Sequence, residues 1–194
     1  MILRRLFAHK KLLLTGAGKD RVGIVKDITG LIFDEEGNIA DSRMSKLRQN
    51  FALMILVELP EENIGSFKQK IKASRETYGI HLEATDVYEE NEKNGETQDQ
   101  KIMIELVGDD QPGIVYNLTQ HLAGKNANID KIDTFSYIAP MGGITLFRVK
   151  TLVTLNKSVG FDEFKEGLKA LEGPLLVSIK VYLAQDGSES SSDS

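Results

Sequence analysis

Hydrophobic residues along the chain follow two kinds of spacing, one typical of strands and one typical of helices. Residues 12–17, 51–59 and 102–107 are apolar runs of strand length, and residues 175–183 alternate apolar with polar positions, which predicts strands. Other apolar residues recur one, three or four positions apart and so share one face of a helix. Four helices are predicted in this way, with the apolar members Ile24, Val25, Ile28, Leu31 and Ile32; Ile64, Phe67, Ile71 and Tyr78; Ile114, Val115, Leu118 and Leu122; and Phe161, Phe164, Leu168 and Leu171.

Weaker patterns supply the remaining strands, at residues 39–47, 80–88, 128–139 and 144–153. The first of these is polar along much of its length, which is typical of a strand at the edge of a sheet. Each half of the chain therefore predicts the order strand-helix-strand-strand-helix-strand. This order indicates an α+β fold made of two tandem ferredoxin-like (βαββαβ) domains, each with an antiparallel sheet and both helices on one face.

One short stretch occurs twice. Gly-Asp-Asp-Gln-Pro-Gly-Ile-Val at residues 108–115 follows an apolar strand and opens a helix, and Gly-Lys-Asp-Arg-Val-Gly-Ile-Val at residues 18–25 does the same 90 residues earlier. The register extends to Thr29 and Thr119, and to the pairs Asn38-Ile39 and Asn128-Ile129. A single unit has thus been used twice, and the loop is its most informative part.

Composition changes place the domain boundaries. Residues 89–100 contain no apolar member and read as a linker between a first domain at 1–88 and a second at 101–184. Residues 185–194 are rich in serine and acid, which predicts a disordered tail. The basic start has two interpretations, a remnant of a targeting segment or a short arm leading into the first strand, and the missing apolar segment favours the arm.

Charge and cysteine content narrow the function. The net charge of −5 and the pI of about 5.3 argue against direct nucleic-acid binding, which requires a basic face. The chain has no cysteine, and no apolar run reaches the length of a membrane span. We expect a cytoplasmic protein without cofactor or metal, while the basic start leaves organellar targeting open.

The repeated loop has the physical properties of an anion site. A turn leading into a helix presents free backbone N–H groups, and the helix dipole favours a carboxylate or phosphate beside them. We expect Asp110 near the N-cap, Pro112 in the first helical turn, and Gly113 where a ligand comes close. A zwitterion fits such a site, with its carboxylate on the N–H groups and its ammonium on Asp or an amide. The alternative is that Asp and Pro only start the helix.

Other chemistry finds little support in the sequence. A Walker A loop requires a Ser or Thr after the lysine, but Asp20 follows Lys19. The dinucleotide fingerprint requires glycine where Arg21 stands. Three histidines are widely separated, and no nucleophile accompanies a base and an orienting acid.

The strand and helix order, the Gly-Asp-Asp-Gln-Pro-Gly-Ile-Val loop and the following Ala127-Asn128-Ile129 together resemble the ACT domain, across nearly the whole chain. Two such domains without a catalytic partner resemble the glycine cleavage system transcriptional repressor family, and the first loop is similar to the regulatory portion of formyltetrahydrofolate deformylases. The resemblance implies a small-ligand sensor whose site lies between paired domains. The ligand-binding residues implied are Asp110, Gln111, Pro112, Gly113, Ile114, Asn128 and Ile129 in the second domain, and Asp20, Arg21, Val22, Gly23, Ile24, Asn38 and Ile39 in the first.

Individual roles follow from this resemblance and from chemistry. Backbone N–H groups near Gly113 and Ile114 would bind a carboxylate, and Asp110 or Asn128 would bind the ammonium. A turn-forming role for Asn128 stays open. The first loop departs from the pattern with Lys19 and Val22, so it either pairs the domains or prefers a more anionic ligand.

These observations predict a non-enzymatic regulatory protein that binds an amino acid, forms a homodimer and signals through a protein partner. Its mechanism would be linkage, in which the ligand favours one packing of the domains. Resemblance to the repressor family implies a transcription factor as the partner. The alternative is an interaction module with vestigial ligand sites, and a small enzyme would require an activity that depends on Asp110.

Overall fold

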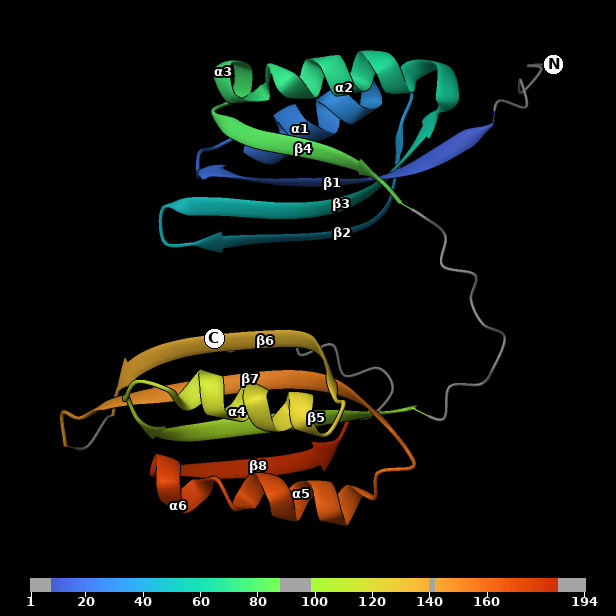
Figure 1. The fold of residues 1–194 in the computed structure, drawn as a ribbon. Helices are drawn as coiled ribbons and strands as arrows, with labels where there is room; N and C mark the ends of the chain where they lie inside the picture. The colour runs from blue at the N-terminus through green and yellow to red at the C-terminus, as the bar shows by residue number, and fades with distance from the viewer. Residues whose placement is uncertain (1–7, 88–98, 140–141, 185–194) are drawn as a thin grey trace. The chain divides into compact units, whose positions relative to one another are not determined.

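The computed structural model describes residues 8–87, 99–139 and 142–184. They belong to two compact units that divide between Lys93 and Asn94, each with its own strands and helices (Figure 1). Residues 1–7 of the predicted arm, most of the predicted linker, and the predicted tail lie outside the described residues.

The first unit has a four-stranded sheet with a helical layer. Its elements are β1 (His9–Lys19), α1 (Ile24–Phe33), β2 (Asn38–Leu47), β3 (Asn50–Pro60), the 3-10 turn η1 (Glu61–Asn63), α2 (Ile64–Lys72), α3 (Ser74–Tyr78) and β4 (Ile80–Asp86). The second unit repeats this order with β5 (Asp99–Asp109), α4 (Ile114–Gly124), β6 (Asn128–Ile138), β7 (Thr145–Asn156), α5 (Phe161–Lys169), α6 (Glu172–Leu175) and β8 (Val177–Leu183).

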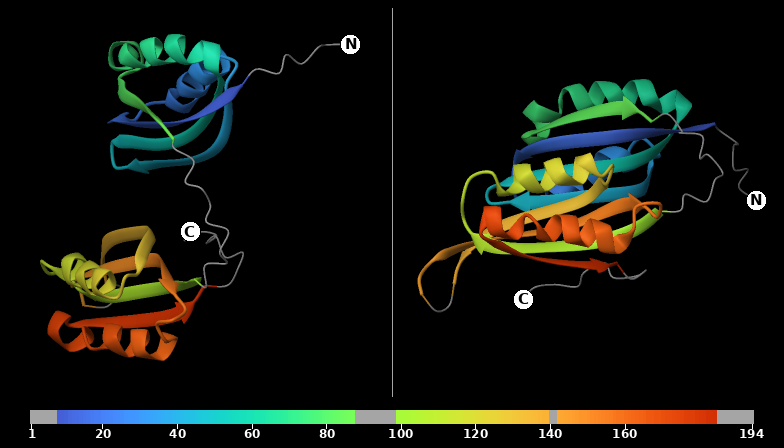
Figure 2. Two further views of the ribbon diagram at one scale, coloured as in Figure 1. Left: turned by 45° about the vertical axis from the view of Figure 1, so that its right-hand side comes forward. Right: turned by 60° about the horizontal axis from the view of Figure 1, so that its bottom comes forward.

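Both sheets are antiparallel and have the same strand order, β2-β3-β1-β4 and β6-β7-β5-β8. The helices of each unit cover one face of its sheet (Figure 2). This is the predicted tandem ferredoxin-like fold, and the polar strand β2 lies at an edge as its composition indicates. A β-bulge follows Ile39 in β2 and Ile129 in β6, so the two units share even this irregularity.

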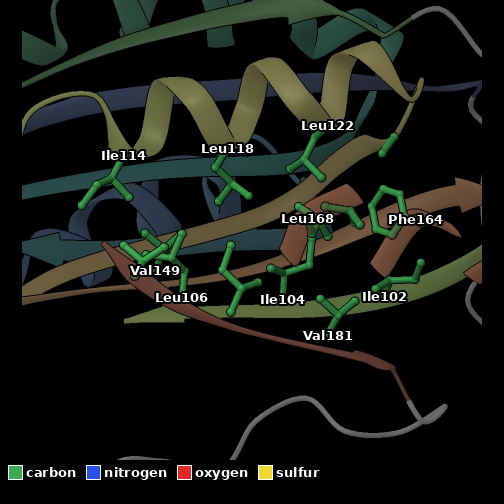
Figure 3. Close-up of a cluster of buried hydrophobic side chains, with 14 of the residues drawn as sticks. Ile102, Ile104, Leu106, Ile114, Leu118, Leu122, Val149, Phe164, Leu168 and Val181 are labelled. Carbon is green, nitrogen blue, oxygen red and sulfur yellow. The ribbon is translucent and has the colours of Figure 1, made fainter. Parts of the chain in front are cut away.

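The core of each unit lies between its helices and its sheet. In the second unit Ile114, Leu118 and Leu122 extend from α4 toward the sheet strands, where Ile104 and Leu106 lie with them in one buried cluster (Figure 3). All five side chains are at most 1% exposed, and burying such a side chain contributes roughly 1.5–3 kcal/mol. The helical spacing seen in the sequence is therefore the packing face of the helix.

Two of the predicted helices are interrupted in the structure. The helix predicted from Ile64, Phe67, Ile71 and Tyr78 breaks at Ala73, where the buried Ser74 hydroxyl accepts the N–H of Leu82 in β4 at 3.2 Å. In the second unit α5 ends at Lys169, before Leu171 of the predicted helix, and Gly173-Pro174 lies inside the separate helix α6. A proline in the first turn needs no backbone hydrogen bond, so a four-residue helix accommodates it.

No helix among the described residues is long and apolar enough to cross a membrane.

Candidate ligand site at the loop before the first helix of each domain

A left-handed glycine forms the turn between the first strand and the first helix of each domain. Gly113 precedes α4 with a φ of 95°, and Gly23 precedes α1 with a φ of 87°. Residues other than glycine rarely adopt this backbone conformation, which explains why both loops have glycine at this position. Pro112 was expected in the first helical turn but lies just ahead of the N-cap, because α4 begins at Ile114.

The start of α4 offers unused backbone donors. No side chain caps it, and the N–H of Asn117 is the first to find a partner, the Gly113 carbonyl at 2.9 Å. Within the described ranges the N–H groups of residues 114–116 have no acceptor, whereas the N–H of Ile24 in α1 donates to Arg21 at 3.3 Å. The second loop therefore has the donors and the dipole that a carboxylate requires.

The loop aspartates point to the edge strand beside them. Ser136 in β6 donates its hydroxyl to Asp110 Oδ2 at 2.9 Å. At the equivalent place in the first domain, Lys46 Nζ in β2 lies 2.6 Å from Asp20 Oδ2. Positions 46 and 136 are 90 residues apart, so the same contact is made with different chemistry.

The residue after each loop aspartate forms a hydrogen bond to the last residue of the short helix before the final strand, α3 in the first domain and α6 in the second. Arg21 Nε donates to the Tyr78 carbonyl at 3.2 Å, and Gln111 Nε2 donates to the Leu175 carbonyl. Tyr78 and Leu175 are the last residues of α3 and α6. Both side chains predicted to meet the ligand therefore hold the fold of the loop.

The predicted site residues differ in solvent exposure, and therefore in which of their atoms a ligand can contact. Ile24 and Ile114 are buried in their cores, so only their backbone can take part. Val22 is fully exposed and Pro112 is also exposed.

The Asn-Ile pairs lie at the far end of the domain from the loop. Asn128 begins β6, and Ser136, which contacts Asp110, lies eight residues further along that strand. Eight residues of strand span roughly 25 Å, so one domain does not bring Asn128 and Asp110 together. Asn128 Nδ2 donates to Asp130 Oδ1 at 3.3 Å, a contact between two side chains of β6.

The two isoleucines of these pairs are partly buried, and the two asparagines occupy equivalent places. Ile39 and Ile129 pack against the cores. Asn38 starts β2 in the same place as Asn128 starts β6. A ligand role for these residues stays a prediction.

Sequence reasoning missed Lys46 and Ser136. The 90-residue register that links the two loops also links these two positions, so the register was the available signal. The register alone does not show that these positions contact the loop aspartates, because a contact between residues 26 positions apart depends on tertiary structure.

No group of three or more His, Cys, Asp or Glu side chains in the described ranges is arranged to hold a metal ion.

Comparison with known proteins adds the following. A family model described as the ACT domain matches residues 10–85. The UPF0237 protein of Methanopyrus kandleri is 32% identical over 79 residues, which are 39% of this chain and 88% of that protein. A UPF0237 protein of Methanosarcina mazei is 31% identical over 74 residues, covering 37% of this chain and 80% of that protein.

Two solved structures match both domains. A protein of unknown function from Galdieria sulphuraria is 26% identical with a TM-score of 0.76, covering 92% of this chain and 100% of that one. A putative glycine cleavage system transcriptional repressor is 18% identical with a TM-score of 0.66, covering 92% and 99%. The second likeness concerns the fold alone.

Proposed function

This chain belongs to the ACT-domain family, and from that premise we propose that it is a non-enzymatic regulatory protein that binds an amino acid and signals through a protein partner. The ligand site proposed is the loop of the second domain, with the carboxylate of the ligand on the free N–H groups at the start of α4. The Asp110 carboxylate receives the ammonium. The observation that carries this proposal is the combination, in one short loop, of unused donors and an acid without a cationic partner in the described ranges.

The proposed mechanism is linkage. A ligand that binds one conformation of the chain better than another shifts the population toward the first, and the partner distinguishes the two. The edge strand β6 is a candidate surface for the partner or for a second copy in a homodimer, because Ile132, Phe135 and Ile138 on it are exposed. If the partner is a transcription factor, the net charge of −5 leaves contact with DNA to that partner.

A second candidate is an interaction module whose ligand sites are vestigial. The first loop favours it, since Lys46 already neutralises Asp20 there. The two candidates differ in whether amino acids change the stability of the chain.

Thermal unfolding of the full chain against each of the common amino acids at millimolar concentration tests the proposal. A ligand at a hundredfold excess over its dissociation constant stabilises the folded state by about 2.7 kcal/mol. We expect one or a few amino acids to raise the midpoint, and Asp110→Asn to remove the shift. Asp133→Asn is the matched control, because it neutralises an exposed acid on β6 whose partner is Lys131. A panel without any shift would favour the interaction module instead.

A further inference from the structure

The two loops carry different charges at equivalent positions. In the first domain two ion pairs hold the loop, Arg21 with Asp27 and Lys46 with Asp20. The equivalent residues of the second domain are Gln111, Asn117, Ser136 and Asp110. Three of these four positions have become neutral, and the one that has not is Asp110.

The Arg21–Asp27 pair has been replaced as a unit. Gln111 donates to the last carbonyl of α6, as Arg21 donates to the last carbonyl of α3. Asn117 donates its side-chain amide to the Gly113 carbonyl at 2.8 Å. Neither Gln111 nor Asn117 is charged, so the second loop has no unpaired charge at these two positions.

The Lys46–Asp20 pair has been replaced only in part. Ser136 supplies one hydroxyl to Asp110, and no cationic side chain of the described residues forms an ion pair with this carboxylate. Lys19 is exchanged for Asp109 in addition, so the second loop has two acids and none of the three cations of the first. Asp110 is therefore an acid, like Asp20, but without the lysine partner that Asp20 has.

We propose that the ammonium of Lys46 occupies, in the first domain, the place that the ammonium of a ligand takes in the second. The first loop is thus closed by its own lysine, and the second loop is the one that binds a free amino acid. This inference rests on the proposed function and adds to it which loop is open, which residue decides this, and that the ligand carries a primary ammonium.

The chemistry of the contact supports an ammonium. Lys46 Nζ lies 2.6 Å from Asp20 Oδ2, slightly closer than the roughly 2.7–2.9 Å typical of a charge-assisted hydrogen bond between an ammonium and a carboxylate. A tethered lysine acts at an effective concentration in the millimolar range or above, so a weak free ligand cannot displace it. At Ser136 the shorter side chain leaves this position to solvent or to a ligand.

Exchange of the two residues tests the inference in the full chain. Calorimetric titration with glycine, L-alanine and L-serine would be carried out on the wild type, Lys46→Ser, Ser136→Lys and the double exchange. We expect one site per chain in the wild type, two in Lys46→Ser, none in Ser136→Lys, and one in the double exchange. D-lactate and L-lactate are the ammonium-free probes, and loss of a charge-assisted hydrogen bond worth about 1.5–3 kcal/mol predicts binding at least tenfold weaker than that of L-alanine.

Matched variants separate binding from folding. Lys46 and Ser136 are both exposed, so the exchanges leave the cores intact. Ser136→Thr keeps the hydroxyl and should bind as the wild type does, and thermal unfolding of every variant checks that both domains remain folded.

Each outcome distinguishes the inference from the proposed function. Wild-type binding that persists in Ser136→Lys, or lactate binding as tightly as L-alanine, would overturn the inference and leave the sensor proposal standing. Binding in Lys46→Ser but not in the wild type would support closure by the lysine and overturn ligand binding at the second loop. Absence of binding in both would overturn the two together.

Discussion

Replacing Gly108 by alanine should strongly destabilise the second domain, although the substitution adds only one methyl group. Gly108 is the second-last residue of β5 and pairs with Val177, the first residue of β8. A Cβ at this position would lie 2.5 Å from the Leu176 carbonyl oxygen, 2.6 Å from Val177 Cγ1 and 2.8 Å from Val177 Cα. Two of these three atoms belong to the backbone, so a side-chain rotation cannot relieve the overlap.

The expected cost of Gly108→Ala follows from this geometry. Inserting a methyl group into packed structure costs about 1–3 kcal/mol, and an overlap with a hydrogen-bonded strand belongs at the upper end. A loss of about 2–3 kcal/mol lowers the midpoint of a domain of this size by about 8–24 °C. Gly124→Ala is the matched control, because a Cβ there meets nothing within 4 Å and Gly124 ends α4. It should be neutral or stabilise by up to about 1 kcal/mol.

Hydrogen exchange read by mass spectrometry, at increasing urea concentration, measures the two domains separately in one chain. Gly108→Ala should lower the urea midpoint of β5, β7 and β8 and leave that of β1 and β3 unchanged. The reasoning would be refuted if Gly108→Ala kept the wild-type midpoint, or if it behaved like Gly124→Ala. A matching loss confined to the first domain is expected for Gly18→Ala, whose Cβ would lie 2.8 Å from the Gly79 carbonyl oxygen.

Three further predictions concern other features of the second domain. Leu176 holds a left-handed φ of 48° where the first domain has Gly79, and it is 66% exposed, so Leu176→Gly should stabilise the domain by up to about 1 kcal/mol in urea unfolding; a destabilised variant would contradict this. Burial, and then Lys125, lower the pKa of His121 below its usual value, so the folded state binds fewer protons than the unfolded state. The contribution of this pKa difference to the free energy of unfolding is therefore present above about pH 6.5 and is lost as the pH falls below it. His121→Leu, which copies Leu31 of the first domain, should reduce this loss between about pH 7.5 and pH 5.5 in urea midpoints, and an unchanged pH dependence would exclude His121 as its source. Burial and the hydrogen bond to Glu105 raise the pKa of Tyr182 to about 12, so an ultraviolet tyrosinate titration should show a late step that Tyr182→Phe removes and Glu105→Gln moves to lower pH, whereas Tyr137→Phe should leave it in place.

The sequence by itself determined the elements and their order. Periods of two and of 3.6 residues reflect local geometry, which repeats along a strand or a helix whatever lies opposite. The stripe of Ile114, Leu118 and Leu122 could therefore be recognised as a core face, and the polar residues of β2 as an edge. The 90-residue register showed the duplication for the same reason, since it is a property of the chain alone.

Where helices end and which side chains meet was decided by the tertiary structure. The break before Ser74 is accompanied by a hydrogen bond from β4, and Pro174 lies in the first turn of a separate short helix, α6. Within one domain the predicted site residues are separated because β6 begins at Asn128 and reaches Ser136, which contacts Asp110, only eight residues further along. These contacts follow from strand register and packing between distant segments, and no local pattern in a sequence records them.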